Sequence, residues 1–165
     1  MLQGNVMGGL YPHTLGEILA DIAKLALAYL LALPIGWNRE REAHRAGIRT
    51  FPIVAIASCG VAIVGAQLGG STADVESRIL QGLVAGIGFI GGGAILKDKG
   101  SVTGTATAAS IWSIGIIGAA VGLRIYHVAI AMTVVNLITL HLLTPRSGSV
   151  LMGPPPPSGD SEAPR

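Results

Sequence analysis

Long apolar runs separated by short polar stretches divide the chain into five segments. An α-helix needs about 20 predominantly apolar residues to cross the hydrocarbon core of a bilayer, and each segment is close to that length. The runs lack the alternation of apolar and polar positions that a transmembrane β-barrel shows. The pattern therefore predicts an all-α, polytopic integral membrane protein with about five transmembrane helices, at residues 17–37, 51–69, 78–96, 103–123 and 125–143.

The two ends of the chain differ in composition from this central part. Residues 1–14 are predicted to form a leader, and residues 144–165 a disordered proline-rich tail, because such a composition cannot bury a core. The transmembrane domain is thus expected over residues 15–143. Basic residues gather after the first and third segments and in the tail, which predicts an N-terminus outside and a C-terminus in the cytoplasm.

Composition supports a lipid environment. Half of the residues are hydrophobic and 12% are charged, compared with about 25% charged residues in soluble domains. The formal net charge is only +2, so the composition gives no indication of a nucleic-acid partner. The sequence shows no nucleophile–base pair, phosphate-binding loop or metal-ligand cluster. We therefore expect no enzymatic activity, no cofactor and no metal site, and the lipid bilayer as the main partner.

Glycines at four-residue spacing mark residues 82–122 as the organising part of the chain. Glycine removes side-chain bulk, so helices that carry it can approach each other closely inside a bilayer. The spacing predicts a tight helical hairpin of 78–96 and 103–123, joined by a turn at 97–100. Trp112 is expected to fill the space opposite the glycines. The predicted helix-packing residues are Gly82, Gly86, Gly88, Gly92, Gly118, Gly122 and Trp112.

An acidic and basic stripe runs along the first predicted helix. Glu17, Asp21 and Lys24 lie at steps of four and three residues, and Ala28, Ala32 and Gly36 continue the same stripe. A stripe that is polar at one end and small at the other is expected to face other helices. Intramembrane charge is costly, so these three polar residues form a candidate site. A neutralised pair of Asp21 and Lys24 that fixes helix packing is the other interpretation.

Four arginines follow the first predicted helix, in a loop expected at residues 38–50. The simplest interpretation of such a basic loop is an anchor that sets the topology and holds anionic lipid headgroups. A regulatory docking surface is the alternative. The residues of this cytoplasmic basic loop are Arg39, Arg41, Arg45 and Arg49.

Several motifs in order resemble one family. They are Gly36-Trp37-Asn38-Arg39-Glu40, residues 46–50, the glycine-rich run 86–95, and Gly104 followed by 107–109 and Trp112. Together they resemble the MgtC/SapB family of bacterial membrane proteins over residues 15–143. The resemblance implies a bacterial inner-membrane protein with about five spans that is linked to magnesium limitation. Members of the family have been labelled Mg²⁺-transport proteins, and for virulence-type members the resemblance implies a regulatory action on membrane ATPases.

The sequence departs from the family pattern in two places. Asn38 stands where the family usually has an acid, and the proline-rich tail stands where many members carry a folded cytoplasmic domain. The chain thus looks like a short, SapB-like member. We expect a non-enzymatic homo-oligomer that influences ion homeostasis by contacting a membrane ATPase or transporter. The alternatives are a small Mg²⁺ or cation transporter that uses Asp21 and Glu17, and a structural or lipid-interacting membrane protein.

Overall fold

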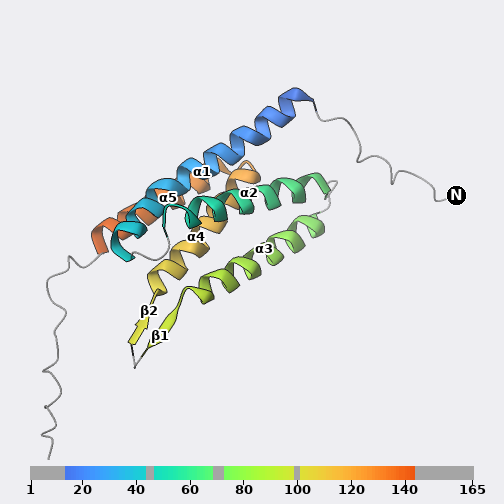
Figure 1. Cartoon of the computed structure of the whole chain (residues 1–165). Helices are drawn as coiled ribbons and strands as arrows, with labels where there is room; N and C mark the ends of the chain where they lie inside the picture. The colour runs from blue at the N-terminus through green and yellow to red at the C-terminus, as the bar shows by residue number, and fades with distance from the viewer. Residues whose placement is uncertain (1–13, 44–46, 69–72, 99–100, 144–165) are drawn as a thin grey trace, which may run out of the picture.

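The described part of the chain forms a bundle of five helices with a short β-hairpin at one end (Figure 1). The computed structural model describes residues 14–43, 47–68, 73–98 and 101–143. This confirms the predicted all-α fold with five helices. The predicted leader before Thr14 and the predicted tail lie outside the described residues. The elements are α1 (Leu15–Ala43), α2 (Thr50–Leu68), α3 (Ala73–Gly93), β1 (Leu96–Asp98), β2 (Ser101–Thr103), α4 (Thr105–Gly122) and α5 (Tyr126–Leu143).

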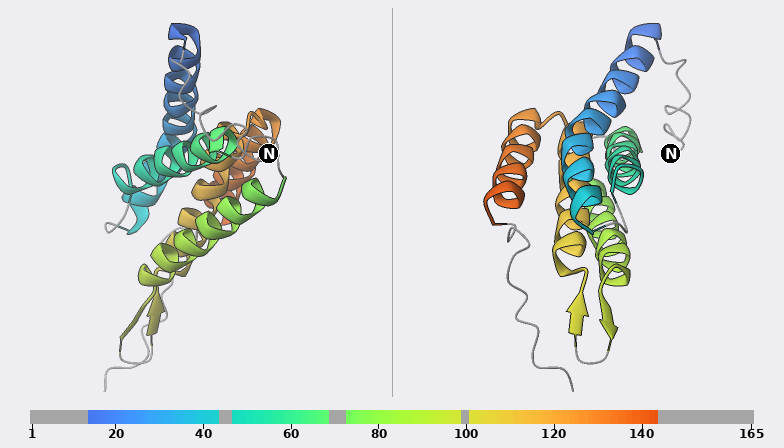
Figure 2. Two further views of the ribbon diagram at one scale, coloured as in Figure 1. Left: turned by 90° about the vertical axis from the view of Figure 1, so that its right-hand side faces the viewer. Right: turned by 60° about the vertical axis from the view of Figure 1, so that its left-hand side comes forward.

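Helix α4 lies at the centre of the bundle. It packs against each of the other four helices, most extensively against α2. Successive helices run in opposite directions, so the start of α1 and the end of α5 lie at opposite ends of the bundle (Figures 1 and 2). The first turns of α1 extend beyond the other helices (Figure 2). The core is formed by buried apolar side chains that include Ala28, Ala32 and Ile35 of α1, Phe51, Ala55 and Cys59 of α2, and Ile114, Ile117 and Val121 of α4.

Three helices within the described ranges are long and apolar enough to cross a membrane. These stretches are Leu15–Arg41, Thr50–Leu68 and Thr105–Gly122, and the apolar stretch Tyr126–Leu142 of α5 is shorter. Large apolar side chains cover much of the outer surface, and Phe89 on α3 is 85% exposed. Such a surface is expected where lipid is the solvent. The chain is therefore a multi-pass membrane protein, and the direction in which it crosses the membrane stays a prediction.

Helix α1 is longer than the sequence pattern predicted. It continues past residue 37 to Ala43, so Arg39 and Arg41 lie on a helix and the predicted loop at 38–50 is wrong in its first half. The carboxylate of Glu40 accepts a hydrogen bond from the backbone N–H of Ile48 at 2.7 Å. A Cβ atom at Gly47 would overlap Glu40. Glycine at 47 therefore allows the chain to return close to α1 before α2 begins.

A β-hairpin replaces the simple turn predicted between the third and fourth helices. Helix α3 ends at Gly93 and α4 begins at Thr105, so the predicted boundaries at 96 and 103 are wrong. The strands are antiparallel, with Leu96 opposite Thr103. Gly104 precedes α4 with a φ of 87°, a left-handed conformation that glycine adopts without the steric cost paid by other residues.

Candidate functional site

The predicted polar site lies where α1 begins, and its centre is Asp21. The ammonium group of Lys24 donates to Asp21 Oδ1 at 2.7 Å, and Gln67 Nε2 of α2 donates to Asp21 Oδ2 at 3.2 Å. Lys24 is 8% exposed. Both carboxylate oxygens of Asp21 are thus engaged, one in an ion pair within α1 and the other in a hydrogen bond that links α1 to the end of α2. The sequence pattern did not identify Gln67, because it lies on a different helix.

Glu17 belongs to a separate local arrangement. Its carboxylate accepts a hydrogen bond from the backbone N–H of Thr14 at 2.9 Å, and its own N–H donates to Thr14 Oγ1 at 3.3 Å. This reciprocal pair is a capping box, which satisfies backbone donors at the start of a helix. Glu17 is exposed. Lys24, Ala28 and Ala32 are buried as predicted, so the inward-facing stripe holds along α1 but does not reach Glu17.

A cleft of about 730 Å³ opens beside this ion pair. It lies between α1, the end of α2, the start of α3 and the connection from α4 to α5. Its charged lining is mixed, because Glu17, Asp21 and Glu76 are acidic whereas Lys24 and Arg124 are basic. Such a cleft can take a small polar or charged solute. No group of three or more His, Cys, Asp or Glu side chains in the described part of the chain is arranged to hold a metal ion.

The predicted basic residues do not form one surface at the opposite end. Arg39 is 7% exposed and lines a cleft of about 570 Å³ at the start of α4, beside Thr105 and Thr107. Arg41 lies over the ring of Trp37, at 5.3 Å from the ring centroid. Arg49 is exposed, and Arg45 lies outside the described residues. The four arginines therefore differ in burial and in neighbours, which their sequence spacing did not indicate.

The predicted packing role of Gly118 and Gly122 on α4 is correct, but the helix that they contact is α2 and not the predicted partner α3. A Cβ atom at Gly118 would overlap the carbonyl group of Ala55, and one at Gly122 would lie 2.6 Å from the carbonyl oxygen of Cys59. Both neighbours are on α2. The backbones of α2 and α4 therefore meet at the closest approach that glycine permits.

The predicted packing role of the glycines on α3 is wrong within this chain. A Cβ atom at Gly82, Gly86, Gly88 or Gly92 would meet nothing within 4 Å. Trp112 is 44% exposed, so it does not fill an interior space either. The physical reason is orientation, because these residues lie on faces that point away from the bundle.

Two glycines that the sequence analysis did not select mediate the α3–α4 contact. A Cβ atom at Gly91 would lie 3.2 Å from the carbonyl oxygen of Ala108, and one at Gly115 would overlap the side chain of Ile87. Gly91 belongs to a run of three glycines in which spacing alone does not single out one position. The predicted hairpin of α3 and α4 thus exists, with different contact residues.

Comparison with known proteins shows which family and which relatives this chain resembles. The sequence matches the MgtC family over residues 25–148. It is 37% identical to Protein SrpB of Synechococcus elongatus over 137 residues, which cover 76% of this chain and 75% of that protein. It is 32% identical to Protein MgtC of Brucella abortus over 123 residues, or 74% and 51% of the two chains. No solved structure matches this chain.

A third relative carries a functional name. The Escherichia coli K12 protein named "Putative magnesium transporter YhiD" is 33% identical over 130 residues, which cover 73% of this chain and 59% of that protein. The chain therefore matches three quarters of the SrpB protein but only about half of the MgtC protein of Brucella abortus.

Proposed function

Since the chain belongs to the MgtC family, we propose that it is a non-enzymatic protein of the bacterial inner membrane that affects magnesium homeostasis by binding other membrane proteins. The partner is a second copy of the chain, a membrane ATPase or a transporter. The name of the YhiD relative supports the link to magnesium. The outward face of α3 supports action through contact.

The outward face of α3 is built like a helix-packing surface but has no helix against it among the described residues. Gly82 and Gly86 lie four residues apart, and a Cβ atom at either would meet nothing within 4 Å. Phe89, one turn further along, is 85% exposed. Small residues let two helices in a bilayer bring their backbones close, so this face suits a helix of another protein or copy. This exposed glycine face is the observation that carries the proposed function.

The direct test replaces a glycine of this face and measures association. The tagged full chain is purified from cells grown at low magnesium, and the co-purifying membrane proteins and its own oligomeric state are recorded. Gly86→Leu is expected to reduce partner recovery and self-association at least tenfold, because the leucine side chain separates the two backbones. The variant chain itself should fold normally, since among the described residues the new Cβ would meet nothing within 4 Å.

Gly60→Leu is the matched control. Gly60 lies on α2, and a Cβ atom there also meets nothing within 4 Å, so the same substitution is made away from α3. It should leave association unchanged. Equal losses from both variants, or normal association of Gly86→Leu, would overturn the role of α3.

A small cation transporter is the second candidate, because the mixed-charge cleft around Asp21 opens at one end of the bundle. The purified protein is reconstituted in liposomes that contain a magnesium-sensitive dye, and Mg²⁺ influx is followed with time. If the protein acts by binding other membrane proteins, Mg²⁺ influx should equal that of empty liposomes. Influx that is lost in Asp21→Asn would favour the transporter and defeat the first proposal.

A further inference from the structure

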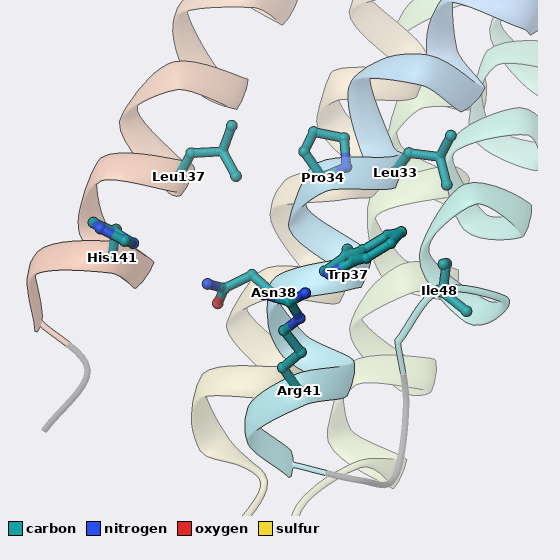
Figure 3. A pocket seen from close by; sticks show the side chains of 8 residues that line it. All are labelled: Leu33, Pro34, Trp37, Asn38, Arg41, Ile48, Leu137 and His141. Atoms are coloured by element: carbon teal, nitrogen blue, oxygen red, sulfur yellow. The ribbon is translucent and has the colours of Figure 1, made fainter. Parts of the chain in front are cut away.

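We infer that a cleft between α1 and α5 binds one molecule of an anionic phospholipid, with its acyl chains beside Leu33 and Leu137 and its phosphate beside Arg41. Figure 3 shows this cleft, which has a volume of about 590 Å³. Pockets for small molecules span about 300–1,000 Å³. The volume therefore suits a headgroup with the first parts of its acyl chains, while the rest of the lipid remains in the bilayer. This site is independent of the proposed function.

The lining of the cleft is divided along the bundle axis. Leu33, Pro34 and Leu137 lie toward the middle of α1 and α5, whereas the polar side chains lie toward the ends of both helices (Figure 3). The apolar stretches of these helices end at Arg41 and Leu142. The polar part of the cleft thus lies where a hydrophobic span ends, which is the depth of lipid headgroups and of interfacial tryptophans such as Trp37.

Arg41 provides the charge that an anionic headgroup requires. Its guanidinium group lies over the Trp37 ring, at 5.3 Å from the centroid. Stacking uses the face of the guanidinium plane, so the N–H groups at its edge stay available to donate to phosphate oxygens. Within the described ranges no carboxylate forms an ion pair with Arg41. The ends of α1 and α5 carry the negative ends of helix dipoles, so the attraction for an anion depends on this side chain.

Two further polar groups line the same cleft. His141 of α5 offers an imidazole N–H, and the amide of Asn38 extends from α1 toward α5 (Figure 3). The Oδ1 atom of Asn38 is buried and has no hydrogen-bond partner in the described structure. Leaving a buried acceptor without a donor is unfavourable. A headgroup hydroxyl, such as those of phosphatidylglycerol, would supply that donor after rotation of the amide.

A phospholipid would contact both the apolar and the polar part of the cleft lining, whereas a soluble phosphate or an apolar helix would contact only one of them. A soluble phosphate would leave the apolar wall beside Leu33 and Leu137 unused. An apolar helix of another protein would leave Arg41 without an anion. Only an amphipathic anion places apolar and charged groups at the two depths that the lining shows.

The test measures lipid binding to the full chain. The protein is placed in nanodiscs of a zwitterionic lipid, phosphatidylglycerol is titrated, and the bound lipid is counted by native mass spectrometry. The expected result is a single retained phosphatidylglycerol, with at least tenfold weaker binding in Arg41→Gln. Asn38→Asp provides a second variant and should weaken binding as well, because its carboxylate would face the phosphate.

Arg49→Gln is the matched control. It makes the same change of charge at an exposed arginine near the same end of the bundle, outside the cleft lining, and should leave the lipid bound. Equal weakening by Arg49→Gln and Arg41→Gln would overturn the site and indicate diffuse attraction. Retention of phosphatidylethanolamine to the same extent, or displacement of the lipid by inorganic phosphate alone, would overturn it too.

Discussion

Helices α3 and α4 carry glycines at the same four-residue spacing, but the surroundings of these glycines are opposite. On α4, Gly118 and Gly122 lie against backbone carbonyl groups of α2. On α3, a Cβ atom added at Gly82 or Gly86 would meet nothing within 4 Å. The same pattern therefore marks a completed helix contact in one place and an open surface in the other. Spacing shows which helices can approach closely, but the partner depends on which way each face points.

The largest effect is expected from Gly118→Ala. Its Cβ atom would overlap the carbonyl group of Ala55, and a backbone group cannot move aside as a side chain can. Overpacking of this kind costs about 1–3 kcal/mol, and occasionally more. The free energy of unfolding in detergent, measured by titration with a denaturing detergent, should fall by that amount. A variant as stable as the original chain would show that α2 and α4 can separate without cost.

A smaller effect is expected from Gly115→Ala. The new Cβ atom would meet the side chain of Ile87 rather than a backbone, so the loss should be about 1 kcal/mol. Ile87→Val removes the Cδ1 atom that lies nearest, and it should restore part of the stability in the double variant. A double-mutant cycle of unfolding free energies measures this coupling. Strict additivity would contradict the proposed overlap between these two positions.

The smallest effect, and one of opposite sign, is expected from Gly82→Ala. Among the described residues nothing lies within 4 Å of the new Cβ, so alanine should stabilise helix α3 by up to about 1 kcal/mol through its higher helix propensity. Thermal unfolding of the monomeric and the self-associated protein should be compared. Stabilisation of the monomer together with destabilisation of the assembled form would show that the α3 face is occupied in the assembly. Destabilisation of the monomer would mean that this face is not open.

Much of the fold followed from local patterns. Five apolar runs predicted five helices, and the stripe through Lys24, Ala28 and Ala32 predicted which face of α1 is buried. The ends of the helices were less predictable. Near the end of α1, the carboxylate of Glu40 accepts a hydrogen bond from the backbone N–H of Ile48, eight residues away. The β-hairpin depends on pairing of Leu96 with Thr103, and three-residue strands are too short to show a pattern.

The candidate site was predictable only in part. Asp21 and Lys24 are three residues apart on one helix, so their ion pair at 2.7 Å follows from helical geometry. Gln67 approaches Asp21 from a position 46 residues away, which no local pattern encodes. The cleft lined by Asn38, Arg41 and His141 likewise requires α1 and α5 to lie side by side. For the polar residues, sequence spacing thus predicted the contact within a helix and missed the contacts between helices.

The opposite directions of successive helices have a consequence for joined copies. Because α1 begins at one end of the bundle and α5 ends at the other, a tandem fusion of two copies through a short linker cannot keep both in the same orientation. The second copy would be inverted across the bilayer. A linker that contains one additional crossing helix would restore the parallel arrangement, so the two fusions distinguish a parallel dimer from an inverted one.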